Sequence, residues 1–171
     1  MRPPSAIAPA APVLRETVVG IGEFGVAAGR GTLMTAGLGS CVAVALYAPD
    51  VRVAALAHVL LPSSQMGRAS ERPAKFADVA VPLLVRELQR HGATGPIIAK
   101  IAGGARMFGS LLSSGVNMGE RNVEAVRRAL AAANVTIAAE DVGGEYGRSV
   151  SVDVATFQVC ITSLDRGDRV L

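Results

Sequence analysis

The sequence predicts a single α+β domain in which hairpin-rich, mixed or antiparallel β-sheets are flanked by two main helices. Short apolar runs with β-branched residues follow one another, separated by turn residues. Two longer segments place apolar residues at helical spacing, and they stand apart instead of alternating with every strand. The chain has 171 residues, of which 50% are hydrophobic, and this suffices for one well-packed domain.

Composition restricts the class of protein. Only 18% of the residues are charged and the net charge is +3. The charges are scattered, so we expect no nucleic-acid partner. The apolar runs end well before the ~18 residues that a membrane span requires, so no membrane insertion is expected. Two cysteines do not make a disulfide framework. Residues 1–16 are rich in Pro and Ala and lack a signal peptide's apolar core. We therefore expect a cytoplasmic protein with a disordered tail over residues 1–16 and one domain over 17–171.

The first half of the domain is predicted to be mainly strands. Residues 17–22 and 33–35 are short candidates. Two apolar runs with β-branched residues follow at 41–47 and 53–61, with a Pro49-Asp50 turn signal between them. Their composition predicts neighbouring strands that are joined by a short turn.

The first helix is predicted from Ala77 to Leu88, because apolar residues recur there at helical spacing. Gly92 is placed to follow its last turn as the residue with a left-handed backbone. Pro82 lies inside this pattern, so it either kinks the helix or marks the helix's true first turn.

The second helix is predicted over residues 120–133, with Asn117 and Glu120 as its capping pair. Strands are predicted on both sides of it, at 97–101 and 135–139. Alternation with period two predicts a final hairpin from residues 149–154 and 157–162.

Three familiar motifs are incomplete or out of context. Residues 20–25 fit the GxGxxG pattern, but no amphipathic helix follows, so we interpret them as a turn that needs a positive φ. Ser40 does not lie in a GxSxG motif, because Leu38 and Val42 stand where the glycines belong. The cysteines and histidines lack the short paired spacings of a zinc site, so no metal or cofactor is expected.

The segment that ends at Cys41 has the composition of a thiol-nucleophile site. Gly37 and Gly39 let backbone amides approach a substrate closely, and the amides around Gly39 and Ser40 are candidates for an oxyanion hole. Cys41 opens a predicted strand, which is a rigid support for a nucleophile. Taken alone, a cysteine in an apolar run is also typical of a buried residue without a chemical role.

Hairpin symmetry predicts a histidine beside this cysteine. If an even-numbered loop is centred on Pro49-Asp50, the residue opposite Cys41 is His58. Opposed residues in an antiparallel pair have Cβ atoms about 4.5–5.5 Å apart, which permits a thiol–imidazole contact. A bulge would instead turn His58 to the other face. The other two reactive residues are predicted to be structural, His91 at a helix end and Cys160 on an alternating strand.

With these residues in view, the sequence resembles the CheD family, the chemoreceptor glutamine deamidases of bacterial chemotaxis. The resemblance runs from about Val18 to Thr162 and departs from the family at Ala36, at Pro82 and in the Pro/Ala tail. It is carried by residues 20–23 (GIGE), 35–42 (TAGLGSCV), 57–62 (AHVLLP), 75–78 (KFAD), 100–105 (KIAGGA), 119–126 (GERNVEAV) and 139–144 (AEDVGG).

The resemblance implies a cysteine-hydrolase-like fold in which Cys41, His58 and Thr35 are catalytic, with Thr35 orienting the imidazole. It implies hydrolysis of glutamine side chains to glutamate in the helical cytoplasmic region of chemoreceptors (methyl-accepting chemotaxis proteins). In this scheme the imidazolium of His58 favours the thiolate of Cys41. A CheC-type phosphatase is a further implied partner. Two alternatives stay open: a regulatory module that binds receptor or phosphatase, and hydrolysis of receptor methyl esters by the same thiol.

Overall fold

The computed structural model describes residues 15–67, 72–107 and 117–171, so the tail predicted over residues 1–16 lies almost wholly outside the described ranges. Within these ranges two five-stranded sheets and two α-helices form an α+β structure, as predicted. The elements are β1 (Glu16–Val18), β2 (Phe24–Ala28), β3 (Thr32–Leu38), β4 (Val42–Ala48), β5 (Val53–Val59), the 3-10 turns η1 (Ser64–Met66) and η2 (Pro73–Lys75), α1 (Ala77–Arg90), β6 (Ile98–Gly103), α2 (Met118–Ala132), β7 (Thr136–Val142), β8 (Arg148–Asp153), β9 (Val159–Ser163) and β10 (Gly167–Val170).

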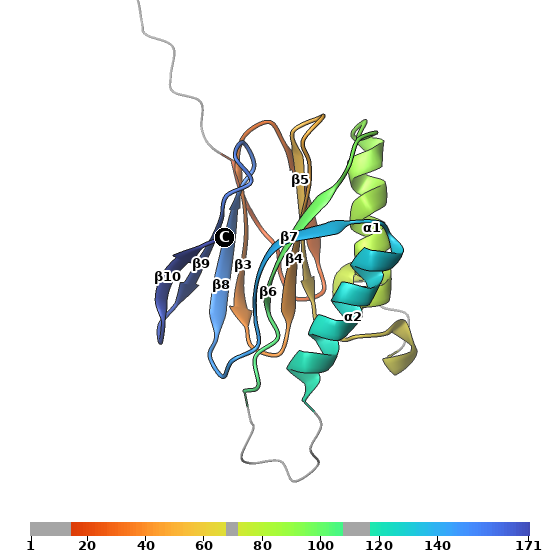
Figure 1. Ribbon diagram of the computed structural model, residues 1–171. Coiled ribbons are helices and arrows are strands. Elements are labelled where there is room, and N and C mark those ends of the chain that lie inside the picture. The colour runs from red at the N-terminus through yellow and green to blue at the C-terminus, as the bar shows by residue number, and fades with distance from the viewer. Residues whose placement is uncertain (1–14, 68–71, 108–116) are drawn as a thin grey trace, which may run out of the picture.

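The two sheets lie face to face, and both helices cover the outward face of the sheet that contains β4 and β5 (Figure 1). The outer sheet has the strand order β1-β3-β8-β9-β10, and the central sheet has the order β2-β5-β4-β6-β7. Each sheet contains one parallel pair, β1 with β3 and β6 with β7, and all its other neighbours are antiparallel. A parallel pair needs a crossover connection, which α2 supplies between β6 and β7.

Strands β4 and β5 are buried along their whole length, because the central sheet is covered on both faces. Val42, Val44 and Leu46 belong to the core that β4 shares with the helices. Cys41 and Ala43 belong to the second core, between the two sheets. Burial on both faces explains why these strands appear in the sequence as continuous apolar runs.

Both predicted helix boundaries are close to those observed. Helix α1 ends at Arg90 and is capped by His91, whose Nδ1 lies 2.8 Å from the Glu87 carbonyl oxygen, and Gly92 follows with φ +94. Pro82 lies inside α1, which already begins at Ala77, so of the two alternatives for this proline the first-turn position is excluded. In α2 the predicted cap is confirmed, because Asn117 Oδ1 accepts a hydrogen bond from the Glu120 amide at 3.2 Å. Neither helix in the described ranges is long and apolar enough to span a membrane.

The sequence did not predict strands β2 and β10. Strand β2 directly follows the glycine-rich turn, in which Gly22 has φ +75, so the predicted turn is confirmed and no dinucleotide-binding helix follows it. Both strands lie at the edge of a sheet, where weak apolar patterning suffices.

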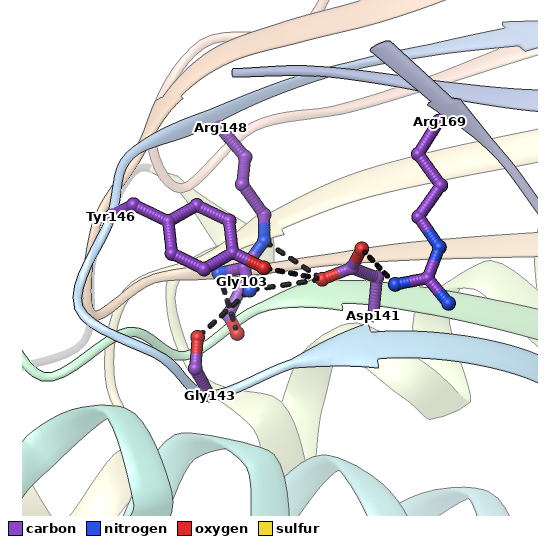
Figure 2. A network of polar contacts seen from close by, with 6 residues as sticks. All are labelled: Gly103, Asp141, Gly143, Tyr146, Arg148 and Arg169. Atoms are coloured by element: carbon purple, nitrogen blue, oxygen red, sulfur yellow. Dashed lines mark hydrogen bonds and ion pairs between the residues drawn. The ribbon is translucent and has the colours of Figure 1, made fainter. Parts of the chain in front are cut away.

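A buried ion-pair network joins the two sheets at one end (Figure 2). Asp141 on β7 of the central sheet pairs with Arg148 on β8 of the outer sheet, with 2.9 Å between Oδ1 and Nη2. Arg148 also donates to the carbonyl oxygens of Gly103 and Gly143. The second carboxylate oxygen of Asp141 pairs with Arg169 at 3.2 Å. The network therefore fixes the position of β8 relative to the end of β6.

Candidate active site

The β4–β5 hairpin differs by two residues from the predicted register. Ala43, not Cys41, lies opposite His58, and Cys41 precedes the first rung of the ladder. The reason is the turn, which consists of the four residues 49–52 and has Arg52 at φ +55. A shift of two residues keeps every side chain on its face, because the alternation has period two. Cys41 and His58 are therefore diagonal neighbours on one face; such residues are about 7–8 Å apart.

Thr35 reaches His58 from the opposing sheet. The hydroxyl oxygen of Thr35 lies 2.8 Å from the carbonyl oxygen of Val19 and 2.7 Å from Nδ1 of His58, and both contacts are buried. A carbonyl can only accept, so the hydroxyl donates to Val19 and accepts from Nδ1–H of His58. This assignment leaves Nε2 as the basic nitrogen of the neutral ring. Among the described residues, Nε2 has no hydrogen-bond partner although it is buried.

The chain passes from the outer to the central sheet between Leu38, the last residue of β3, and Val42, the first residue of β4. The pairing of β3 with β8 shifts by one residue between Thr35 and Leu38, and Gly37 adopts φ +73 in this bulge. Such a bulge bends the strand and redirects the chain that follows. Consequently Thr35 lies on the outer sheet, while Cys41, six positions later, directly precedes β4 in the central sheet.

The backbone from Gly39 to Cys41 is held by its carbonyl groups. The carbonyl oxygen of Gly39 accepts a hydrogen bond from the amide of Ala105 (2.8 Å), and that of Cys41 accepts one from the amide of Gly104 (2.7 Å). The carbonyl oxygen of Ser40 accepts a hydrogen bond from Nδ2 of Asn122 (2.9 Å). In a trans peptide the N–H points away from the carbonyl oxygen. The N–H groups of Ser40 and Cys41 thus point away from these partners, and neither donates to another described residue.

Glycine is required where other backbone crosses this loop. Gly103 has φ +115, and a Cβ there would overlap the carbonyl oxygen of Cys41. A Cβ on Gly39 would lie 2.9 Å from Cγ of Met107. Backbone therefore approaches backbone closely at Gly103, whereas the close neighbour of Gly39 is the side chain of Met107.

Burial controls protonation in the site. Cys41 is only 7% exposed, and burial raises the pKa of its thiol, an effect that its own backbone amide partly offsets. Burial lowers the pKa of the His58 imidazole. Both directions favour a neutral thiol and a neutral imidazole over the ion pair expected from the sequence.

We expect alkylation of Cys41 by iodoacetamide to follow an apparent pKa above that of a free thiol, about 8.5. The physical reason is that burial raises the pKa of the thiol and lowers the pKa of the His58 imidazole, so it disfavours both members of an ion pair. Peptide-resolved mass spectrometry across a pH series measures this and separates Cys41 from Cys160. Rapid alkylation of Cys41 near pH 6 would instead demonstrate a preformed ion pair.

The sequence did not single out Asn122, whose side chain is fully buried beside the loop. It lies on α2 four residues before Val126 and eight before Leu130, on the face that enters the core. A polar residue on the apolar stripe of an amphipathic helix was the available signal. The structure thus places Thr35 and His58 in contact, Cys41 on the same face as His58, and Gly39 and Ser40 in the adjoining loop.

The chain is similar to several known proteins. The family model described as "CheD chemotactic sensory transduction" matches residues 60–163. The chain is 44% identical over 153 residues to the "Chemoreceptor glutamine deamidase CheD" of Thermotoga maritima, covering 89% of this chain and 94% of that protein. It is 46% identical over 151 residues to the "Probable chemoreceptor glutamine deamidase CheD 2" of Geobacter metallireducens, covering 86% and 93%. It is 44% identical over 161 residues to the "Probable chemoreceptor glutamine deamidase CheD" of Symbiobacterium thermophilum, covering 92% and 98%.

Proposed function

This chain belongs to the CheD family, and on that premise we propose that it hydrolyses selected glutamine side chains of chemoreceptors to glutamate with release of ammonia. Relatives named chemoreceptor glutamine deamidases support the reaction and the substrate. The observation that carries the proposal is the buried hydrogen bond between Thr35 and His58, on the face that Cys41 shares. It leaves Nε2 of His58 as the base that a thiol nucleophile needs.

In the first step Sγ of Cys41 attacks the carbonyl carbon of the glutamine side chain. The thiol proton passes to Nε2 of His58 as the S–C bond forms, and the carbonyl electron pair moves onto oxygen. The amides of Ser40 and Cys41 donate hydrogen bonds to this oxyanion. Gly39, which has no side chain, leaves their approach open.

In the second step the His58 imidazolium gives its proton to the substrate nitrogen. The C–N bond breaks, ammonia leaves, and a thioester to Cys41 remains. Nε2 then takes a proton from a water molecule whose oxygen attacks the thioester. The S–C bond breaks, the proton returns to sulfur, and the product is a glutamate side chain. His58 thus acts as base and acid in turn, while Thr35 keeps its Nδ1 protonated.

Mass spectrometry of a purified chemoreceptor cytoplasmic fragment, incubated with the protein, tests this function. Each converted glutamine adds about one mass unit and can be located by peptide mapping. Hydrolysis of a methyl ester would instead remove about fourteen units, and a module that only binds would leave the masses unchanged. Either result would overturn the proposal.

Two finer assignments belong to this proposal. The reaction takes place in the cytoplasm, because the proposed substrate region of the receptor lies there. A CheC-type phosphatase is a second partner, which family membership implies. If the phosphatase competes with receptor, adding it to the receptor assay reduces the rate of ammonia release; an unchanged rate would remove it as a competitor.

Replacing Thr35 by valine is expected to lower kcat about 10- to 100-fold with little change in KM. The isosteric valine removes the acceptor for Nδ1–H, so the ring no longer holds the tautomer that leaves Nε2 basic. The matched control is Thr35→Ser, which keeps the hydroxyl and should retain most of the activity. Ammonia release measures both variants. Equal losses in the two variants would show that the hydroxyl does not orient the ring.

A further inference from the structure

Asn122 makes two hydrogen bonds to backbone on either side of the proposed catalytic pair. Its Nδ2 donates to the carbonyl oxygen of Ser40 at 2.9 Å and to that of Leu60 at 3.0 Å. Because both partners are carbonyl oxygens, the amide orientation is fixed: the reverse would place Oδ1 against two acceptors. Ser40 immediately precedes Cys41, and Leu60 lies two residues after His58.

These bonds replace a rung that the hairpin lacks. The ladder between β4 and β5 ends at the pair of Val42 and Val59. Ser40 lies just before β4 and Leu60 just after β5, and the side-chain amide of Asn122 connects their two carbonyl oxygens. The strands are therefore held together at the end where Cys41 lies.

Helix α2 approaches this loop closely because its first turn contains Gly119. A Cβ on Gly119 would overlap the carbonyl groups of Gly104 and Ala105. The amides of these same two residues hold the carbonyls of Cys41 and Gly39. Asn122 thus projects from a helix whose start is packed against the backbone that supports the loop.

Filling space does not account for an asparagine at this position. Oδ1 of Asn122 is buried and has no hydrogen-bond partner among the described residues. An unpaired buried acceptor destabilises the fold, whereas leucine has a similar shape and carries no such penalty. What leucine cannot provide is a donor for the carbonyl of Ser40.

We propose that Asn122 is a positioning residue, which holds the Ser40 carbonyl and so turns the N–H of Cys41 toward the oxygen of the substrate amide. The inference rests on the proposed function, since that N–H is one of the two oxyanion donors. In a planar peptide the orientation of the carbonyl determines that of the N–H. Releasing the carbonyl lets the peptide rotate, so the donor is lost to the transition state while substrate binding is little affected.

The test compares Asn122→Leu with Asn117→Ala in the full chain. Asn117 caps the same helix, and no hydrogen bond joins its side chain to residues 39–41 within the described part of the chain, so its variant controls for a weakened α2. With a receptor fragment as substrate, Asn122→Leu should lower kcat about 10- to 100-fold and leave KM nearly unchanged. Asn117→Ala should retain kcat. Asn122→Ala serves as the second variant if the leucine variant does not fold, as judged by circular dichroism.

Alkylation of Cys41 by iodoacetamide separates positioning from loss of structure. This reaction forms no oxyanion, so its rate should be the same in Asn122→Leu and in the unaltered protein. A kcat equal to that of Asn117→Ala would overturn the inference, and so would a parallel fall in kcat and alkylation rate. If the unaltered protein releases no ammonia, the proposed function fails and this inference fails with it. If the unaltered protein releases ammonia but the Asn122 variants do not show the expected loss of kcat, the proposed function stands and the positioning role of Asn122 is rejected.

Discussion

Replacing Cys41 by alanine is expected to reduce ammonia release from a receptor fragment by at least about 1000-fold. In the proposed mechanism only the Cys41 thiol forms the thioester, because His58 is assigned to proton transfer and the Thr35 hydroxyl donates its hydrogen bond to the carbonyl of Val19. Cys41→Ala removes one sulfur atom from the core between the sheets, so the fold should persist with a loss of at most about 1 kcal/mol. Ammonia release and thermal unfolding measure the two effects separately.

The second cysteine provides a matched control for this variant. Cys160 is half-buried on β9 of the outer sheet, away from the connection between β3 and β4. Cys160→Ala should therefore release ammonia at the unaltered rate. Activity retained by Cys41→Ala, or lost in Cys160→Ala, would remove Cys41 as the nucleophile.

The same variant separates catalysis from regulation by binding. If the protein acts mainly by occupying the receptor, Cys41→Ala should complement a strain that lacks the unaltered protein. If hydrolysis is the function, that variant should bind the receptor fragment equally well and fail to complement. Binding and complementation together therefore decide between a hydrolase and a regulatory binding module, which is one of the two alternatives that the sequence left open.

The sequence predicted which face Cys41 and His58 share but not their register. Alternation fixes the face, since a shift by two residues leaves it unchanged. Register depends on the length of the turn, and nothing in the sequence requires the left-handed φ of Arg52 that extends the turn to four residues. The predicted pairing of Cys41 with His58 was therefore wrong, while their placement on one face was right.

Sequence patterns could not predict the contacts between the two sheets. Thr35 and His58 lie on strands of different sheets, so no periodicity relates them, and only the family resemblance pointed to Thr35. Asp141 and Arg148 likewise meet across the two sheets. The fold class was predictable because it depends on composition and periodicity within segments, whereas these contacts depend on how the segments stack.

Breaking the ion pair between the sheets should have the largest effect on stability. In Arg148→Met, the carboxylate of Asp141 stays 6% exposed without its buried partner, whose own side chain is 1% exposed. The carbonyls of Gly103 and Gly143 also lose a donor. We expect the free energy of unfolding to fall by about 3 kcal/mol, the lower end for breaking a buried ion pair, because the buried carboxylate keeps only the largely exposed Arg169 as a charged partner. Urea unfolding followed by circular dichroism measures this loss.

Arg169→Met is the matched control, since it removes the other arginine from the same carboxylate. The side chain of Arg169 is 65% exposed, so solvent screens its ion pair and its loss should cost about 1 kcal/mol or less. Equal losses in the two variants would show that the buried pair contributes no more than the exposed one.

The ion pair also bears on the proposed active site, through one short stretch of backbone. Arg148 donates to the carbonyl of Gly103, and the next residue, Gly104, donates to the carbonyl of Cys41. Loosening this stretch frees the loop that carries the thiol. We therefore expect Arg148→Met to lower kcat even at temperatures where it remains folded, whereas Arg169→Met should not. A fully active, folded Arg148→Met would show that the loop is held in place without the hydrogen bond from Arg148 to Gly103.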